Sequence, residues 1–529
     1  MRDIEIPLVK DRTWKYRFWE ILPGTVSWTI LLMPVVLSIL NPTLYGIYII
    51  AFLLTWFIKA IGLNIRSFQG FRMMNRQMSL DWTVLLEDLE AGQMVHPGTK
   101  LPSWHERNIT RLTERPLCMP PSEVIHAIII ATYNESREIL EPTIKSVLAS
   151  KFDMKKVILI LAYEERGGAE VEKNANDLMR EYSGEFMYSA AIKHPANMPD
   201  EVIGKGGNIT YAGREFQKYL EKKKIDPSHV IVTTLDADNR PHPSYLSALT
   251  YTWCSTEDPR YVSYQPIPMF LNNIWDAPSP MRVIATGNSF WNIVLSMRPH
   301  MLRNFSSHAQ GMHALIDTDF WSVRTIVEDG HQFWRTYFRY DGRHEVFPIF
   351  LPIYQDAVLS TSYKKTLKAQ FIQLRRWAWG VTDIAYFASK GFRKDSKVPT
   401  YDKFAKFGRL FEGHISWATA SLLLAFGASI PVLLRPKNYL AGSLPHIASN
   451  IQTLALAGIF ITLFLSLKSL PPKPERYKRH RSIWMVLQWV LLPVTTIVYN
   501  TLSSVYSQTR LMFGKYYDKF DVTDKAVKK

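Results

Sequence analysis

The chain of 529 residues is 47% hydrophobic and 13% aromatic, and its 63 Lys and Arg exceed its 47 Asp and Glu to give a formal net charge of +16. Two cysteines, Cys118 and Cys254, exclude a disulfide framework and a Cys-rich zinc site. The basic residues crowd beside apolar segments, as in 10–20 and 473–482, which is typical of the cytosolic face of a membrane. We therefore expect membrane lipids as partners and no nucleic acid.

Two apolar segments, 24–40 and 44–58, come first in the chain. Basic residues flank the pair on both sides, which predicts a transmembrane helical hairpin over 24–63 with both ends in the cytosol. The N-terminal stretch 1–23 is then cytosolic. Residues 64–122 mix polar and apolar types between prolines, and we expect them to form a connecting arm.

From 123 to 380 the pattern alternates between strand and helix. The stretch 124–135 predicts a strand that runs into a loop, 136–150 a helix capped by Ser136, and 155–165 a second strand. This order is typical of a βαβ unit in a parallel sheet, so we expect an α/β domain here.

Two carboxylates, Asp236 and Asp238, directly follow a β-branched apolar run at 230–235. The run is typical of an interior strand, and ligands of open α/β sheets bind beyond the carboxyl ends of the strands. Mg²⁺ is usually held by one or two carboxylates together with substrate phosphates. The alternative is that the two acids only open a turn or cap a helix, and this stretch alone does not decide between them.

Further candidates follow the other predicted strands. Tyr133 and Glu135 follow the first strand and Glu164 ends the second, where an aromatic wall and fixed polar groups could bind a nucleotide base. Lys205 stands beside two glycines in 204–208, which would let the backbone approach a diphosphate while the lysine offsets its charge. Ordinary loop acids and a simple glycine turn are the alternatives.

A third group of candidates lies near the end of this domain. Gln373, Arg376 and Trp377 stand at i, i+3 and i+4, so a helix would present them on one face. Trp offers a flat platform for a sugar ring and Arg neutralises phosphate oxygens. An amphipathic helix with a membrane-facing Trp is the alternative.

Four short motifs occur in chain order, namely ATYNE (131–135), KGGN (205–208), DAD (236–238) and QLRRW (373–377). Together they resemble the family 2 glycosyltransferases, specifically the processive, cellulose-synthase-like branch. The tail stretch KFDVTDK (519–525) is similar to the gating loop of that branch. Its matching residues are Phe520, Val522, Thr523 and Lys525.

The resemblance implies a GT-A (Rossmann-like) fold for 123–380, a nucleoside-diphosphate sugar as donor, with UDP as the expected carrier, and Mg²⁺ or Mn²⁺ as cofactor. It also implies residue roles. Asp236 would contact the nucleotide and, with Asp238, the metal. The remaining positions are implied as follows: Tyr133, Glu135, Glu164 and Lys205 at the nucleotide sugar, and Gln373, Arg376 and Trp377 at the diphosphate and the acceptor. The family's usual Asp after the second strand is here Glu164 or Glu165.

An inverting transfer needs a carboxylate that takes the proton of the acceptor hydroxyl. The family uses the Asp of a Thr-Glu-Asp motif. The literal match at 256–258 comes too soon after the metal pair and belongs to a turn, whereas Asp329 in IVED lies where the motif is expected, with Val327 in place of Thr. We therefore predict Asp329 as the base and hold Asp356 in reserve.

The chain after 380 becomes apolar and basic again. We expect amphipathic interface helices at 381–411 and two transmembrane helices within 412–470, at 415–434 and 447–467. A basic loop and an interfacial or re-entrant helix, broken at Pro493, are expected in 471–513, because a full crossing would carry the tail 514–529 away from the active site. The prediction is four spanning helices in the cell membrane, with the catalytic domain and both termini cytosolic.

The sequence thus predicts a membrane-embedded inverting glycosyltransferase that extends a growing polysaccharide. Four helices form a thin conduit, so a homo-oligomer or an accessory subunit is a further expected partner. Two alternatives stay open. One is a non-processive transferase with a lipid acceptor, and the other is a catalytically silent membrane scaffold or transporter.

Overall fold

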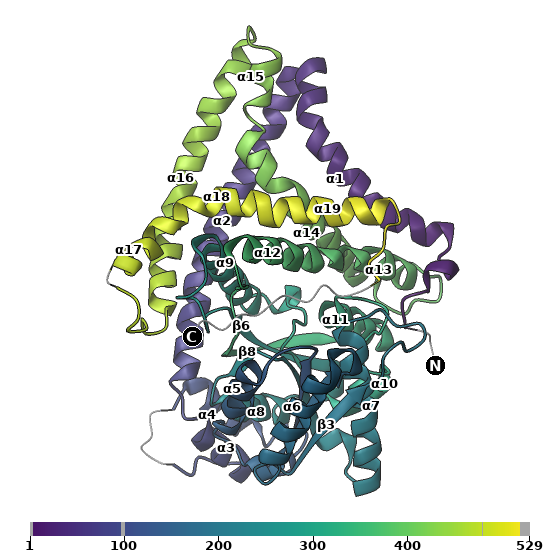
Figure 1. Ribbon diagram of the computed structural model, residues 1–529. Helices are drawn as coiled ribbons and strands as arrows, with labels where there is room; N and C mark the ends of the chain where they lie inside the picture. Colours follow the sequence, from purple (N-terminus) through teal and green to yellow (C-terminus); the bar gives the residue numbers. More distant parts are fainter. Residues whose placement is uncertain (1–3, 97–100, 479, 519–529) are drawn as a thin grey trace.

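The computed structural model describes residues 4–96, 101–478 and 480–518. Figure 1 shows a lower α/β part and an upper part of long helices, with further helices lying crosswise between them. The chain starts at the side of the α/β part, enters the upper helices, and returns to build the sheet before it re-enters the upper part.

One sheet of eight strands forms the centre of the lower part, in the order β3-β2-β1-β4-β7-β6-β8-β5. Its pairing is mixed, because β7 is antiparallel to both β4 and β6, while β1 is parallel to β2 and β4, and β6 is parallel to β8. The predicted parallel pairing of the first two strands is confirmed. The strands are β1 (Ile125–Thr132), β2 (Val157–Glu164), β3 (Tyr188–His194), β4 (Val230–Asp236), β5 (Arg240–Pro241), β6 (Val262–Met269), β7 (Ala309–Gly311) and β8 (Glu345–Tyr354).

Helices cover both faces of the sheet, which is why β1 and β2 are almost continuously apolar. Successive side chains of β1 enter opposite layers of the core: Ile128 packs on the side of α5 and α6, and Ile129 on the side of α7. The helices of this part are α5 (Arg137–Leu148), α6 (Gly168–Glu181), α7 (Lys205–Lys223), α8 (Tyr245–Cys254), α9 (Ser279–Ser296), α10 (Met312–Asp317), α11 (Glu328–Arg339), α12 (Tyr363–Ala378) and α13 (Asp383–Gly391).

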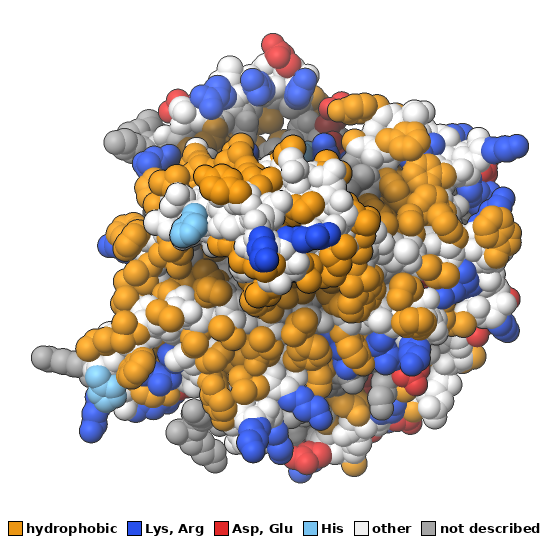
Figure 2. Space-filling view, turned by 90° about the horizontal axis from the view of Figure 1, so that it is seen from above, with side chains coloured by type: hydrophobic (Ala, Val, Ile, Leu, Met, Phe, Trp, Pro, Cys, Tyr) orange, Lys and Arg blue, Asp and Glu red, His pale blue; other side chains and the backbone are white. Residues whose placement is uncertain are grey.

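In the described part of the chain, four helical stretches are long and apolar enough to cross a membrane. They are α1 (Trp14–Leu40), α2 (Pro42–Met78), α16 (Tyr439–Ser469) and the run His480–Met512, which contains α17 (His480–Leu487), α18 (Leu492–Thr495) and α19 (Leu502–Met512). Seen from above, hydrophobic side chains cover much of the upper face, and Lys and Arg side chains lie around its edge and in a small group near its middle (Figure 2). The arm that follows α2 contains α3 (Trp82–Ala91) and α4 (Ser103–Arg111).

The set of candidate spans differs from the sequence prediction at two places. The expected span 415–434 is divided between α14 (Thr400–Phe426) and α15 (Ile430–Leu434), because the chain turns at 427–429. Neither helix is among the four that are long and apolar enough to cross a membrane. The run 480–512, which we expected in the interface, is long and apolar enough to cross a membrane. Figure 1 nevertheless shows α18 and α19 lying across α1, α2 and α16 rather than alongside them. Its interfacial location stays a prediction.

Candidate active site

A single cavity of 1650 Å³ lies between the carboxyl edge of the sheet and the upper helices. All eleven site residues predicted within the described part of the chain line this cavity. They are Tyr133, Glu135, Glu164, Lys205, Asp236, Asp238, Asp329, Asp356, Gln373, Arg376 and Trp377. The predicted gating residues Phe520, Val522, Thr523 and Lys525 lie outside the described residues.

The sheet topology explains why residues so far apart in sequence meet here. Because β1, β2, β4, β6 and β8 all run in the same direction, their carboxyl ends lie at one edge. Asp236 is the last residue of β4, and Asp356 follows the end of β8 by two residues. The amide of Asp356 donates to Asp238 Oδ2 at 2.9 Å, so the reserve candidate for the base lies directly beside the predicted metal ligand.

Lys205 forms the centre of a charged cluster at this edge. Its Nζ lies 2.7 Å from Asp236 Oδ1 and 3.9 Å from Glu328 Oε1, and it donates to the carbonyl of Ser306 at 3.3 Å. Burial alone would lower the pKa of Lys205, but the charges of Asp236, Glu328 and Asp329 raise it above its usual value. The lysine therefore stays charged and holds three carboxylates together.

Two of those carboxylates open α11. Glu328 is only 4% exposed, and burial with the neighbouring charge of Asp329 raises its pKa to about 8. Burial also raises the pKa of Asp329, against the opposing charge of Lys205. Asp329 Oδ1 accepts a hydrogen bond from the amide of Gly330 at 2.7 Å. Sequence reasoning selected Asp329 and missed Glu328, although both belong to the same IVED stretch.

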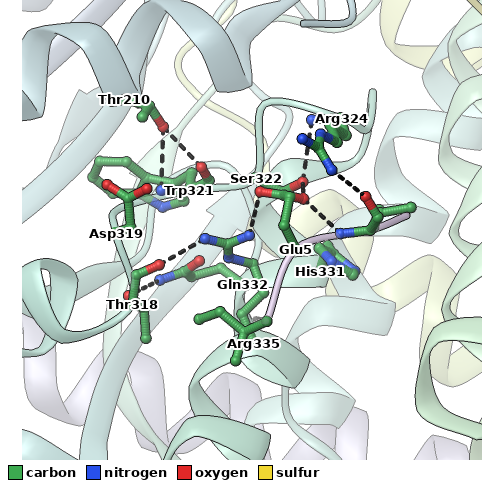
Figure 3. A network of polar contacts seen from close by, with 12 residues as sticks. Glu5, Thr210, Thr318, Asp319, Trp321, Ser322, Arg324, His331, Gln332 and Arg335 are labelled. Carbon is green, nitrogen blue, oxygen red and sulfur yellow. Dashed lines mark hydrogen bonds and ion pairs between the residues drawn. The ribbon is translucent and has the colours of Figure 1, made fainter. Parts of the chain in front are cut away.

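The N-terminus of the chain fixes the position of α11. Glu5 reaches Arg335 of α11 at 2.5 Å and accepts from Ser322 Oγ at 2.5 Å, while Arg335 donates to the carbonyl of Thr318 at 2.6 Å (Figure 3). From the other side, Thr210 of α7 donates to the carbonyl of Trp321 at 2.9 Å. The loop between α10 and α11 therefore ties the helix of Lys205 to the helix of Asp329.

The predicted nucleoside contacts have protein partners of their own. Glu135 accepts from Thr132 Oγ1 at 2.9 Å and from the amide of Tyr133 at 2.9 Å, so its carboxylate stabilises the loop after β1. Glu164 pairs with Arg166 and lies 3.2 Å from His194 Nδ1. These contacts hold the loops in place, and a role in binding a nucleoside remains a prediction for both residues.

The glycines of the KGGN motif face protein atoms, which corrects the expectation that they make room for a diphosphate. A Cβ on Gly206 would lie 2.4 Å from the carbonyl oxygen of Ser322, and one on Gly207 would lie 2.6 Å from Glu201 Oε2. Asn208 of the same motif donates from Nδ2 to the carbonyls of Ala162 at 3.0 Å and Thr132 at 3.3 Å. The motif therefore packs the start of α7 against the loop before α11 and joins the ends of β1 and β2.

The residues of the QLRRW motif lie on α12, which also borders the cavity. Gln373, Arg376 and Trp377 all line the cavity, and the Trp377 ring lies 6.0 Å from that of Phe270 at the end of β6. The literal Thr-Glu-Asp match does not line it: Asp258 accepts from the amide of Arg260 at 3.1 Å and caps a turn. Its assignment to a turn agrees with the structure.

The oxygen donors at the sheet edge fit a hard divalent cation. No group of three or more His, Cys, Asp or Glu in the described chain could hold a metal ion. Two carboxylates are nevertheless enough when substrate phosphates complete the coordination. Asp238 is 7% exposed, and Asp236 is a third exposed and paired with Lys205, so the donor set of the two fits an ion that arrives with a phosphorylated ligand.

Comparisons with known proteins give low similarity. No protein-family profile and no curated protein sequence matches the chain. Among solved structures, the chain is similar to a mannosyltransferase from Pyrobaculum calidifontis in complex with GDP-Man and Mn²⁺, at 13% identity over 86% of this chain and 100% of that chain, with a TM-score of 0.39. It is also similar to S. aureus TarS 1–349 in complex with UDP-GlcNAc, at 12% identity over 76% and 95%, with a TM-score of 0.34. TM-scores this low support no conclusion, so the function is inferred from the chain's own residues.

Proposed function

We propose that this protein is an inverting glycosyltransferase of the family 2 type, which transfers a sugar from a nucleoside-diphosphate sugar to the hydroxyl group of a growing saccharide at a membrane. The observation that carries the proposal is the single cavity that all eleven predicted residues line. A scaffold without activity has no need to bring the carboxylates of β4, of α11 and of the loop after β8 into the same cavity as Gln373 and Arg376.

The reaction follows from the positions of the acids. The acceptor oxygen attacks the anomeric carbon and forms the new glycosidic bond, while the bond from that carbon to the β-phosphate oxygen breaks. The nucleoside diphosphate leaves with the electron pair, and the acceptor proton passes to the carboxylate of Asp329. Burial raises the pKa of Asp329 and so makes it a better proton acceptor than an exposed aspartate.

The remaining residues bind and orient the donor. Asp238 and Asp236 would hold Mg²⁺ or Mn²⁺, which, when bound, offsets the charge that grows on the leaving diphosphate. Arg376 supplies a planar guanidinium for phosphate oxygens, and Trp377 a flat surface for a sugar ring. Tyr133 with Glu135 and Glu164 would border the nucleoside, with UDP as the proposed carrier.

The long apolar helices support a location in a membrane. We place the α/β part and both termini in the cytosol, because the basic residues that flank α1 and α2 favour that side. The tail motif at 519–525 supports a processive enzyme, and the length of the product on a gel would separate it from a single-transfer enzyme.

The experiment is release of nucleoside diphosphate by the purified, detergent-solubilised chain. UDP-glucose, UDP-GlcNAc, UDP-glucuronate and GDP-mannose are each offered with Mg²⁺, Mn²⁺ or EDTA. We expect metal-dependent release from one donor and a loss of roughly 10²–10⁴-fold in Asp238→Ala and Asp329→Asn. Asp258→Asn is the matched control, since it removes an acid of the same sequence motif that lies outside the cavity. Full activity in both cavity variants would overturn the proposal.

A further inference from the structure

The same cavity has a second charged region, away from the sheet edge and toward the upper helices. Three arginines line it from three separate elements: Arg66 on α2, Arg298 just after α9, and Arg409 on α14. We call this set the arginine cluster. It contains no residue that the sequence analysis selected for the reaction.

The guanidinium groups of the arginine cluster lack anionic partners among the described residues. The nearest acceptors are backbone carbonyls, with Arg66 donating to Gly62 at 3.0 Å and Arg409 to His300 at 3.5 Å. Arg298 is partly buried, and its Nε has no hydrogen-bond partner in the described chain. By contrast, Lys59 in the same cavity is paired with Glu412 at 2.8 Å.

The three cations also repel one another. Burial and then the charges of Arg66 and Arg409 lower the pKa of Arg298. Burial lowers the pKa of the neighbouring His300, and the charges of the arginine cluster, of which Arg409 contributes most, lower it further. Like charges gathered at a partly buried site without a counter-charge are unfavourable unless an anion binds there. Planar guanidinium groups form bidentate hydrogen bonds with the oxygens of phosphate.

Apolar side chains line another part of the same cavity. They come from the same helices and from the run after residue 490, and include Trp56, Leu63, Trp417, Leu424 and Leu492. The apolar part of α2 precedes Arg66, and that of α14 follows Arg409. Arg66 therefore lies where a candidate membrane span gives way to charged side chains, and Arg409 lies at a similar border in α14, which is the expected level of lipid head groups.

We propose that the arginine cluster binds the phosphate of a membrane lipid that carries the saccharide acceptor. The lipid chain would lie against the apolar lining, and the saccharide hydroxyl would extend toward Asp329 in the same cavity. The role of this site in binding the acceptor rests on the proposed function. The binding of a lipid phosphate rests on the arginine cluster itself. An uncharged polysaccharide alone would gain nothing from three cations, so the site favours a lipid-linked acceptor.

The test is lipid binding to the full, detergent-purified chain without any donor, measured by native mass spectrometry. The probes are a polyprenyl phosphate, the matching polyprenyl alcohol, phosphatidylglycerol and inorganic phosphate. We expect the polyprenyl phosphate to bind at least tenfold more tightly than the alcohol. Arg66→Ala and Arg298→Ala should each weaken it by roughly 10–100-fold, the value of a charged hydrogen bond.

Two variants guard against misfolding and general charge effects. Arg298→Lys keeps the charge and should retain part of the affinity. Arg72→Ala removes an exposed arginine of the same helix α2 that does not line the cavity, and should bind like the unchanged protein. Equal binding of phosphate and alcohol, or equal loss in Arg72→Ala and Arg66→Ala, would overturn the proposal. Equal binding of phosphatidylglycerol, or displacement of the lipid by inorganic phosphate at matched concentration, would overturn it as well.

Donor binding is measured separately, without lipid, so the two proposals can fail independently. Metal-dependent binding of a nucleotide sugar with no preference for the phosphorylated lipid would leave the proposed function standing and remove this inference. Lipid-phosphate binding that depends on Arg66 and Arg298, without binding of any donor, would keep the anion site and remove its role as an acceptor site.

Discussion

The sheet edge and the arginine cluster differ in whether their charged side chains have oppositely charged partners within the protein. At the sheet edge, Lys205 is surrounded by Asp236, Glu328 and Asp329, so the charge of the lysine is compensated within the protein. In the arginine cluster, Arg66 and Arg298 have no carboxylate partner in the described part of the chain. The sheet edge is therefore organised before any ligand arrives, whereas the arginine cluster is completed by an anion.

This difference has a physical cause in the folding of each region. The sheet edge consists of strand ends and of α7 and α11, which are tied together by backbone and side-chain hydrogen bonds such as that of Thr210 to Trp321. Buried charges in such a place must be paired in the folded state. Arg66 and Arg409 lie at the borders of the apolar parts of α2 and α14, and Arg298 follows α9.

The largest effect is expected from Lys205→Met, which removes the cation of the sheet edge and leaves its carboxylates together. We expect a loss of about 3–5 kcal/mol in the free energy of unfolding, because the remaining charges are partly buried and uncompensated. Thermal unfolding in detergent measures it. Lys218→Met serves as control, since it breaks an exposed pair with Glu215 on the same helix and should leave stability nearly unchanged. An equal loss of stability in Lys205→Met and Lys218→Met would show that the stability of the sheet edge does not depend on the ion pairs of Lys205.

A smaller effect is expected from Glu5→Gln, which weakens the contact between the N-terminus and α11. The carboxylate lies 2.5 Å from Arg335, and this neighbour with Ser322 holds the pKa of Glu5 below its usual value in spite of burial. We expect a loss of about 2–3 kcal/mol in stability. If Glu5 positions Asp329, turnover should fall while donor affinity stays the same.

Steady-state rates and equilibrium donor binding separate these two contributions. Glu114→Gln is the control, because it changes an exposed carboxylate of the same type in the connecting arm. Equal loss of donor affinity and of turnover in Glu5→Gln would indicate a general loss of folded protein instead of a positioning effect.

The sequence predicted the sheet edge better than the arginine cluster, and the reason is physical. The strand before Asp236 and the helical spacing of Gln373, Arg376 and Trp377 are local patterns, and parallel strands bring their ends together by topology alone. The arginines come from α2, from the end of α9 and from α14, and no local pattern shows that these elements converge.

Two differences between expectation and structure have the same origin. The apolar content of 415–434 predicted one span, because hydropathy does not report the turn at 427–429 that separates α14 from α15. Gly206 and Gly207 were expected to let the backbone approach a diphosphate, whereas their Cβ positions face the carbonyl of Ser322 and the carboxylate of Glu201, whose places depend on tertiary packing.

A pH-dependent contribution is expected from His194 at the rim of the sheet edge. Burial alone would lower its pKa, but the carboxylates of Glu164 and Glu201, at 3.2 and 3.0 Å, raise it to about 9. Because the folded pKa exceeds the unfolded value of about 6.5, this stability is fully present below pH 6.5 and is lost as the pH rises through 9. The difference in unfolding free energy between the unchanged protein and His194→Gln should shrink by roughly 1–2 kcal/mol between pH 6.5 and 9.5. A constant difference across this range would contradict the charged pairing.

The smallest effect is expected from the loss of Arg298, in contrast to the loss of Arg282 near the other end of α9. Arg282 is buried and donates to Gln488 Oε1 at 2.5 Å and to the carbonyl of Ala277 at 2.8 Å, so Arg282→Met should cost about 2–4 kcal/mol. Among the described residues Arg298 has no such partner, and Arg66 and Arg409 repel it, so Arg298→Met should leave lipid-free stability within about 1 kcal/mol or raise it. Thermal unfolding of the two variants in the same detergent, with and without polyprenyl phosphate, measures both effects. Stabilisation by the lipid should persist in Arg282→Met and disappear in Arg298→Met, because only the second substitution removes a cation that the phosphate would bind.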